Sequence, residues 1–306
     1  LKQDCLLLAG GTDLLPMLKR RNRTAPHLLN IKRIPELKGI SYSQHTGLHI
    51  GCAVTLRDVI DHPVVSKKYP LLAQAAGAVG FNQLRNMATL GGNVCLDNKC
   101  SYFNQSAFWW KSRPACFKRG GDLCYVVKGG KECFSLSAAD TVSALMVLDA
   151  ELIIRGPEHE RRIPIAGFYS GNGQKPHDLR EDEIVSAILI PPEDRGWKQG
   201  FLKKSARGSV DFAIASLSVR LKVSGSIVED ARIALNGVST KPVRPAEAEN
   251  YLKGKKIADG TVAHAAESAI KEIKPLSLIG ASAFLRRNVI RAMFEDLMAS
   301  ALFPVA

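Results

Sequence analysis

Residues Gly91-Gly92-Asn93-Val94-Cys95 lead directly into a cysteine-rich segment. Four of the chain's seven cysteines lie in that segment, at Cys100, Cys116, Cys124 and Cys133. A glycine turn of this kind indicates backbone N–H groups offered to an anion such as a phosphate. Thiolates are the ligands that iron–sulfur clusters use. The stretch therefore predicts two redox cofactors bound next to each other.

The spacing of the four cysteines is Cys100-x15-Cys116-x7-Cys124-x8-Cys133. Structural zinc sites usually contain CxxC pairs, and this segment has none. An odd number of cysteines in a large chain without a secretion signal favours metal ligands or free thiols over disulfides. Spacing alone leaves an iron–sulfur cluster, a zinc site and free structural cysteines open. Cys5 and Cys52 lie in apolar strand patterns, and Cys95 is a possible substitute ligand.

A second glycine-rich turn lies near the N-terminus. The apolar run Cys5 to Leu8 leads into Ala9-Gly10-Gly11-Thr12-Asp13, and apolar residues then recur at helical spacing from Leu14. Thr12 or Asp13 can cap the helix, whose N-terminus favours a phosphate. An ordinary strand-to-helix turn is the alternative, because the stretch is neither a Rossmann fingerprint nor a P-loop. Together with the turn at Thr89–Asn93, it could hold one dinucleotide from two sides.

Length and composition indicate an ordinary globular protein. The 306 residues suffice for about two domains of ~150 residues. No apolar run approaches the ~20 residues of a membrane helix. The net charge of +13 comes from scattered Lys and Arg residues without a recognition motif, so we expect no nucleic-acid partner, although an acidic protein partner is compatible with it. We expect no signal peptide, and further residues before the first strand.

Short strands alternate with helices, which predicts an α+β fold. The range Pro191 to Gly196 is the expected domain boundary. Beyond it, Phe212 to Val223 alternates as a half-buried strand does, and it forms a hairpin with Ile227 to Leu235. We predict that this sheet is covered by the three helices Pro245 to Leu252, Val262 to Ile273 and Ala281 to Leu302. No catalytic triad or His-rich zinc pattern occurs in the chain.

These features together resemble the FAD-binding subunits of molybdenum hydroxylases, the xanthine dehydrogenase and carbon monoxide dehydrogenase family, over essentially the whole chain. Ala9–Leu14 and Arg85–Asn93 look like that family's two pyrophosphate loops. The resemblance implies no catalytic residue and these FAD contacts: Leu8, Ala9, Gly10, Gly11, Thr12, Asp13, Leu14, Thr89, Gly91, Gly92, Asn93, Asp140, Val185 and Lys203. Asp140 would bind the ribityl chain, or alternatively cap a helix, while Val185 and Lys203 would approach the flavin ring.

The resemblance also implies a domain plan. A two-subdomain FAD-binding domain of the vanillyl-alcohol oxidase-like (PCMH) type would span 1–195, with subdomains at about 1–33 and 34–195. A C-terminal α/β sandwich domain of the CO dehydrogenase flavoprotein type would span 196–306. Ordinary members pass from GGN to the aspartate motif in a few residues, whereas here an insert of about 96–135 carries the four cysteines.

This insert looks like that of the β subunit of 4-hydroxybenzoyl-CoA reductase, where four cysteines hold a [4Fe–4S] cluster. A similar insert occurs in some periplasmic aldehyde oxidoreductases. The resemblance implies a cytoplasmic dimer of heterotrimers, with a molybdopterin subunit and a small two-[2Fe–2S] subunit. Electrons from a ferredoxin would pass through the cluster, FAD and [2Fe–2S] centres to remove a phenolic hydroxyl from 4-hydroxybenzoyl-CoA. An aldehyde oxidoreductase or aromatic/heterocycle hydroxylase subunit is the alternative, and a zinc or nucleic-acid-binding module is the rival from another class.

Overall fold

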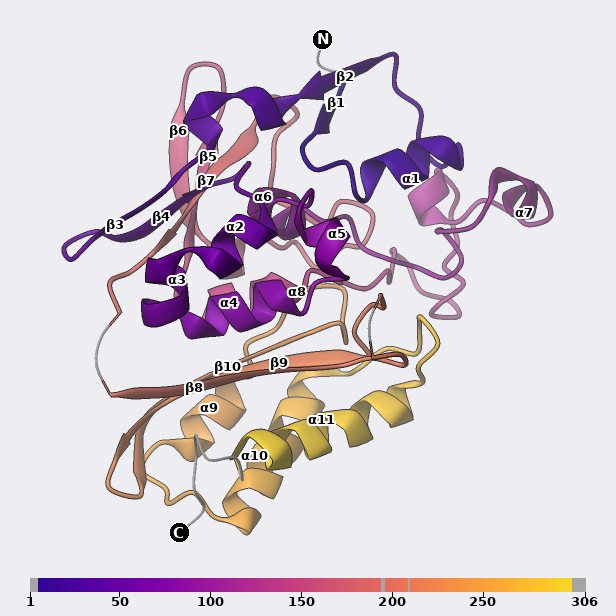
Figure 1. Cartoon of the computed structure of the whole chain (residues 1–306). Helices are drawn as coiled ribbons and strands as arrows, with labels where there is room; N and C mark the ends of the chain where they lie inside the picture. Colours follow the sequence, from indigo (N-terminus) through magenta and orange to yellow (C-terminus); the bar gives the residue numbers. More distant parts are fainter. Residues whose placement is uncertain (1–4, 194–195, 209, 299–306) are drawn as a thin grey trace.

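The computed structural model describes residues 5–193, 196–208 and 210–298, and it contains three separate sheets (Figure 1). The first consists of two parallel strands, β1 (Cys5–Leu8) and β2 (His27–Asn30), joined through helix α1 (Leu14–Lys19). The predicted strand, glycine turn and helix are therefore confirmed. The turn residues Ala9 to Asp13 lie between β1 and α1.

A five-stranded antiparallel sheet forms the centre of the N-terminal part. Its strand order is β3 (Ile40–Ser43), β4 (Gly47–Gly51), β7 (Ile184–Ile190), β5 (Glu151–Arg155) and β6 (Glu160–Pro164). Leu48, Ile50, Leu152 and Ile188 are fully buried, because helices cover the inner strands. Strand β3 was not expected from the sequence, since only four residues with mixed polarity form it. The sheet brings Val185 on β7 toward the glycine loops.

Besides α1, seven α-helices belong to this part of the described chain: α2 (Leu56–Asp61), α3 (Pro63–Lys68), α4 (Pro70–Gly77), α5 (Asn82–Arg85), α6 (Leu90–Val94), α7 (Ala107–Lys111) and α8 (Asp140–Val147). Thr55 caps α2 by accepting a hydrogen bond from the Asp58 amide. Every residue of α8 is buried. Short 3-10 helices occur at η1 (Ile31–Arg33), η2 (Pro35–Leu37), η3 (Phe117–Arg119) and η4 (Ile165–Gly167).

The C-terminal part is a three-stranded antiparallel sheet with helices on both faces (Figure 1). Its order is β10 (Ile227–Asn236), β9 (Ala215–Ser224) and β8 (Trp197–Lys204). Helices α9 (Ala246–Leu252), α10 (Asp259–Ile273) and α11 (Ala283–Met298) cover one face, and α8 contacts β9 and β10 on the other. The predicted hairpin and three helices are confirmed, while the expected helix end at 299–302 lies outside the described residues.

One expectation about this sheet is wrong. The alternating pattern predicted a half-buried strand, but seven consecutive residues of β9, from Ala215 to Leu221, are buried. The polar face is buried because α8 covers it. Ser218 Oγ donates to Ser143 Oγ on α8 at 2.9 Å, and Arg220 Nη1 donates to the Val147 carbonyl at 3.2 Å. Polar side chains here join the two domains.

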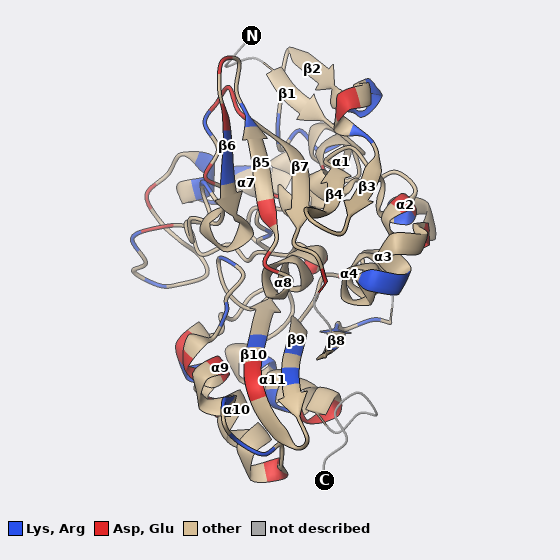
Figure 2. Cartoon of the chain, turned by 90° about the vertical axis from the view of Figure 1, so that its left-hand side faces the viewer, with Lys and Arg blue, Asp and Glu red and all other residues tan. Residues whose placement is uncertain are grey.

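The cysteine-bearing insert leaves the N-terminal part after α6 and returns just before α8. An isolated antiparallel bridge between Lys99 and Leu136 closes its base, with both N–H···O distances at 2.8 Å. Basic and acidic residues are spread over many elements in Figure 2 and are not gathered in one stripe. Among the described helices, none has the length and apolar character needed to cross a membrane.

Candidate functional site

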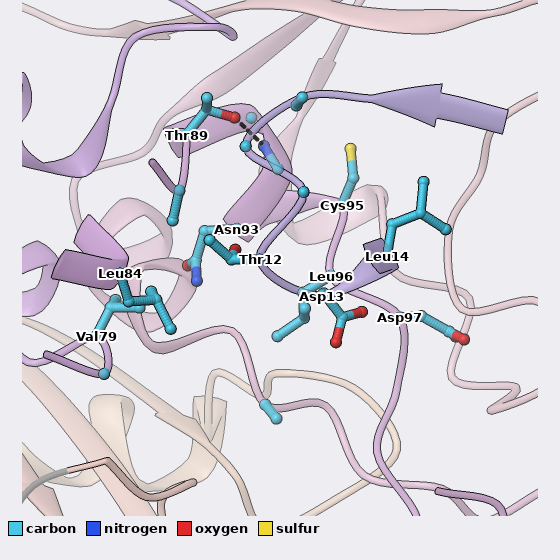
Figure 3. Close-up of a pocket in the computed structure, with 18 of the residues that line it drawn as sticks. Thr12, Asp13, Leu14, Val79, Leu84, Thr89, Asn93, Cys95, Leu96 and Asp97 are labelled. Atoms are coloured by element: carbon cyan, nitrogen blue, oxygen red, sulfur yellow. Dashed lines mark hydrogen bonds between the residues drawn. The ribbon is translucent and has the colours of Figure 1, made fainter. Parts of the chain in front are cut away.

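The two glycine loops face a common cavity of about 500 Å³ (Figure 3). Residues Ala9 to Leu14 line it from the first loop, and Thr89, Gly91, Gly92 and Asn93 line it from the second. Asp140 and Val185 complete the set, so of the expected FAD contacts only Leu8 and Lys203 do not line the cavity. Sequence motifs about 80 residues apart are thus brought together around a space suited to a nucleotide.

Glycines are needed in these loops because protein segments pass close to one another. A Cβ on Gly10 would lie 2.1 Å from the Met87 carbonyl oxygen, which belongs to the second motif. A Cβ on Gly91 would lie 2.5 Å from Cys52 Cβ, and Gly11 has a positive φ of 71°. Gly10 therefore allows the two loops to pack together, Gly91 allows the second loop to pack on Cys52, and Gly11 allows the turn itself.

The two loops differ in their free hydrogen-bond donors. Among the described residues, none accepts a hydrogen bond from the amides of Gly10, Gly11, Thr12 or Asp13. In contrast, the second loop forms the short helix α6. There Gly91 N–H donates to the Cys52 carbonyl and Gly92 N–H donates to Thr89 Oγ1, each at 3.0 Å. Thus the first loop offers unpaired amides to an anion, whereas these two amides of the second loop are already paired.

Asp140 and Lys203 form a buried ion pair beside the cavity. Lys203 Nζ lies 2.6 Å from Asp140 Oδ2 and 2.9 Å from the Ala78 carbonyl oxygen. Asp140 is the first residue of α8 and its side chain makes no capping bond, so the helix-cap alternative is wrong. Burial raises the pKa of Asp140 to about 6, while the Lys203 ammonium opposes this rise. The pair occupies one carboxylate oxygen, and none of the described residues donates to the other.

Several lining residues carry no sequence motif and were not predicted. Val79 and Leu84 lie together and add apolar surface, Leu96 adds more beside Asp13 (Figure 3), and Phe81 also lines the cavity with 37% of its surface exposed. Cys52 and Cys95 also line this cavity, and burial raises the pKa of each thiol to about 12. Since Cys95 faces the nucleotide cavity, its position does not support the alternative in which it replaces a cluster ligand.

The four cysteines of the insert line a second, much smaller cavity. Cys100, Cys116, Cys124 and Cys133 all border it, together with the aromatic rings of Tyr102, Phe103, Phe117 and Tyr125. Its volume of about 10 Å³ is room for about one water molecule, so the thiols must separate to admit a larger group. Burial raises the pKa of the Cys100 thiol, and the backbone N–H groups of Tyr102 and Phe103 oppose the rise.

The donor set fits a soft polynuclear cluster. Within the described residues, no three His, Cys, Asp or Glu side chains are arranged to hold one metal ion. A cluster differs from a single zinc ion in that each thiolate binds a different iron atom, so the four sulfur atoms surround a larger volume. Amide N–H groups directed at the thiols are also typical surroundings of iron–sulfur centres. Four thiols around one cavity therefore fit an iron–sulfur cluster in their chemistry, although not in the present volume of the cavity.

Comparison with known proteins identifies both parts of the chain. Residues 2–193 match the FAD binding domain in molybdopterin dehydrogenase, and residues 200–301 match the CO dehydrogenase flavoprotein C-terminal domain. The carbon monoxide dehydrogenase medium chain of Hydrogenophaga pseudoflava is 31% identical over 277 residues, covering 90% of this chain and 81% of that one. The aldehyde oxidoreductase FAD-binding subunit of Escherichia coli is 32% identical over 260 residues, covering 80% and 78%.

Solved structures give the same result. The structure of carbon monoxide dehydrogenase from Hydrogenophaga pseudoflava matches with a TM-score of 0.80 at 28% identity, covering 99% of this chain and 91% of that one. Quinoline 2-oxidoreductase from Pseudomonas putida 86 matches with a TM-score of 0.79 at 25% identity, covering 98% and 90%. The expected mixed α/β fold, with a FAD-binding domain and a flavoprotein C-terminal domain, is confirmed. The chain belongs to the family of FAD-binding medium subunits of molybdenum hydroxylases, which includes the xanthine and carbon monoxide dehydrogenases.

Proposed function

We propose that this chain is an electron-transfer flavoprotein subunit that binds FAD in the large cavity and a [4Fe–4S] cluster through Cys100, Cys116, Cys124 and Cys133. The observation that carries the proposal is that all four thiols border one cavity, whereas Cys52 and Cys95 border the other. In this proposal, residues 1–195 form a FAD-binding domain with subdomains at about 1–33 and 34–195, and residues 196–306 form a C-terminal domain.

The residues of the large cavity suit the parts of FAD. The unpaired amides of Gly10 to Asp13 would receive the pyrophosphate, and the free oxygen of Asp140 would accept from ribityl hydroxyls. Val185 would pack on the flavin ring, and Lys203 would keep Asp140 ionised and in place. FAD and the cluster would together supply two-electron and one-electron redox chemistry, and the protein would position both and exclude water.

We further propose that the complex resembles 4-hydroxybenzoyl-CoA reductase, converting 4-hydroxybenzoyl-CoA to benzoyl-CoA. It would be a cytoplasmic dimer of heterotrimers with a molybdopterin-binding large subunit and a two-[2Fe–2S] small subunit. The length and four-cysteine content of the insert support this reading. A ferredoxin is the proposed electron donor, because the chain carries a net charge of +13 and the insert exposes basic side chains such as Lys111 and Lys128.

A second candidate is a FAD and [4Fe–4S] subunit of an aldehyde oxidoreductase or an aromatic or heterocycle hydroxylase, in which electrons leave the molybdenum subunit. The observation that favours it is the 32% identity with the FAD-binding subunit of the Escherichia coli aldehyde oxidoreductase. The two candidates share the cofactors of this chain. They differ in the direction of electron flow and in the substrate of the partner subunit.

The ligand set is tested by iron and sulfide per flavin in single Cys→Ser variants. We expect Cys100→Ser, Cys116→Ser, Cys124→Ser and Cys133→Ser each to lose most of the iron and sulfide while keeping FAD. The matched control is Cys95→Ser, which should keep both. Loss of the cluster in Cys95→Ser with retention in one of the four would refute this ligand set. Metal without sulfide in the unaltered protein would refute the cluster itself.

The direction of electron flow is tested on the purified complex. Reduced ferredoxin with 4-hydroxybenzoyl-CoA should yield benzoyl-CoA in the first candidate, measured by chromatography of the thioesters. Aldehyde-dependent or heterocycle-dependent reduction of a dye, with no turnover of the thioester, would instead establish the second candidate.

A further inference from the structure

A chain of ion pairs connects the cysteine cavity with the nucleotide cavity. Lys118 borders the cysteine cavity, and its ammonium lies 2.7 Å from Asp97 Oδ1. Asp97 borders the nucleotide cavity, and its other oxygen accepts from Arg23 Nη2 at 3.1 Å. Arg23 also borders the nucleotide cavity. Three charged side chains from separate segments thus connect the two sites directly.

The ion pair between Lys118 and Asp97 is held in place by further hydrogen bonds. The Lys118 side chain is only 5% exposed, and its three donors are all used: Asp97 Oδ1, the Asn98 carbonyl at 3.1 Å and the Gly173 carbonyl at 2.9 Å. Its ammonium also lies 5.3 Å from the centre of the Phe103 ring. A buried lysine with every donor paired cannot move without breaking several bonds at once.

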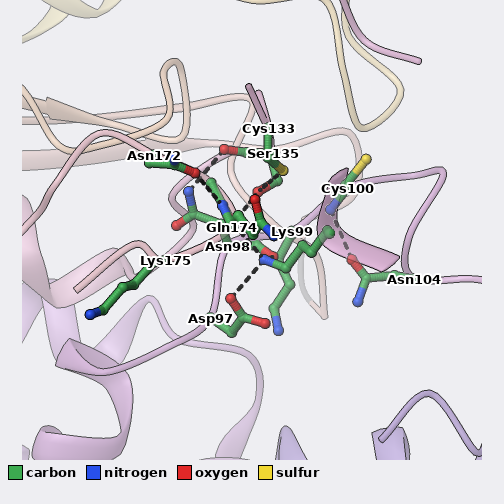
Figure 4. Close-up of polar contacts among 12 residues, drawn as sticks. Asp97, Asn98, Lys99, Cys100, Asn104, Cys133, Ser135, Asn172, Gln174 and Lys175 are labelled. Atoms are coloured by element: carbon green, nitrogen blue, oxygen red, sulfur yellow. Dashed lines mark hydrogen bonds and ion pairs between the residues drawn. The ribbon is translucent and has the colours of Figure 1, made fainter. Parts of the chain in front are cut away.

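Each residue of the pair lies close in the sequence to a cysteine that borders one of the two cavities. Lys118 follows Cys116 by two residues, on the turn η3, and Asp97 follows Cys95 by two residues at the start of the insert. Figure 4 shows Asp97 and Asn98 in one hydrogen-bonded group with Cys133, Ser135 and Asn172 nearby. If the thiols shift as their cavity opens, Lys118 would therefore shift with them. Asp97, which is paired with Lys118 and borders the nucleotide cavity, would shift as well.

We propose that Lys118 and Asp97 are positioning residues that couple the two sites, so that filling the cysteine cavity and binding the flavin nucleotide strengthen each other. This inference rests on the proposed [4Fe–4S] site. Coupling between two sites is reciprocal, and coupling factors of about 5- to 150-fold are typical. We expect a coupling factor of about tenfold, since the link is one buried pair supported by Arg23.

The test is a cycle of FAD dissociation constants, measured by flavin fluorescence on iron-loaded and iron-depleted protein. In the unaltered chain, iron removal should weaken FAD binding about tenfold. In Lys118→Met, iron-loaded protein should already bind FAD about tenfold more weakly, and iron removal should change the constant less than twofold. Asp97→Asn should behave the same way, and Lys118→Met with Asp97→Asn should be no weaker than either single variant.

The control is Lys128→Met, because Lys128 is an exposed lysine of the same insert. It should keep the full tenfold response to iron. If Lys118→Met also keeps that response, iron acts on FAD by another route and the coupling role is overturned. If the unaltered chain binds iron and sulfide but its FAD dissociation constant is the same with and without them, only the coupling is overturned. An unaltered chain that takes up no iron and sulfide overturns the cluster proposal, and the coupling with it.

Discussion

Substituting Gly10 by alanine tests whether the two glycine loops must pack together to form the nucleotide cavity. The added Cβ would lie 2.1 Å from the Met87 carbonyl oxygen and 2.8 Å from Ala88 Cα. Ordinary contact begins at 3.4 Å, so the loops must separate by about 1.3 Å. The obstructing atoms belong to the backbone and cannot rotate away. Overpacking of this kind costs about 1–3 kcal/mol.

The expected result for Gly10→Ala is a lower melting temperature and a FAD dissociation constant raised by about tenfold or more, because 1.4 kcal/mol corresponds to a factor of ten. Thermal unfolding by circular dichroism and flavin fluorescence titration measure the two effects. Gly77→Ala is the matched control: Gly77 ends α4, and a Cβ there meets no atom within 4 Å. Its FAD affinity should be unchanged. Wild-type affinity and melting in Gly10→Ala would refute the close packing of the loops.

Two further predictions concern buried charges. Arg286 is fully buried and donates to four backbone carbonyls, those of Leu276, Ile214, Gly237 and Leu278. Arg286→Leu should therefore lower the free energy of unfolding, measured in urea, by about 3 kcal/mol or more. An unchanged urea midpoint would contradict this prediction. The folded pKa of Asp140, about 6, lies above the ordinary 3.8, so the folded state holds that proton more tightly. The free energy of unfolding of the flavin-free protein should then fall by on the order of 3 kcal/mol as pH rises from about 4 through about 6. The urea midpoint of Asp140→Asn, measured over the same pH range, should lack this fall. If the urea midpoints of the two proteins change with pH in parallel, the prediction is refuted.

The features predicted correctly from the sequence are those with local causes. The glycines near residue 10 and the alternating pattern around Ser224-Gly225 each determine a turn through a few adjacent residues, and the structure has both turns. The features that were missed depend on distant partners. The Gly91 amide is paired because Cys52 lies opposite, and β9 is buried on both faces because α8 covers it. The pairing of Lys203 with Asp140 joins residues 63 positions apart.

The place of the insert brings the proposed cluster site next to the proposed flavin site. The insert leaves the chain directly after α6, one wall of the nucleotide cavity, and returns just before Asp140, another wall. The bridge between Lys99 and Leu136 holds these two ends together. Lys99 Nζ also lies 2.5 Å from Asp13 Oδ1 in the first loop. A cluster held by the insert, as proposed above, would therefore lie close to both loops, as electron transfer between it and FAD would require.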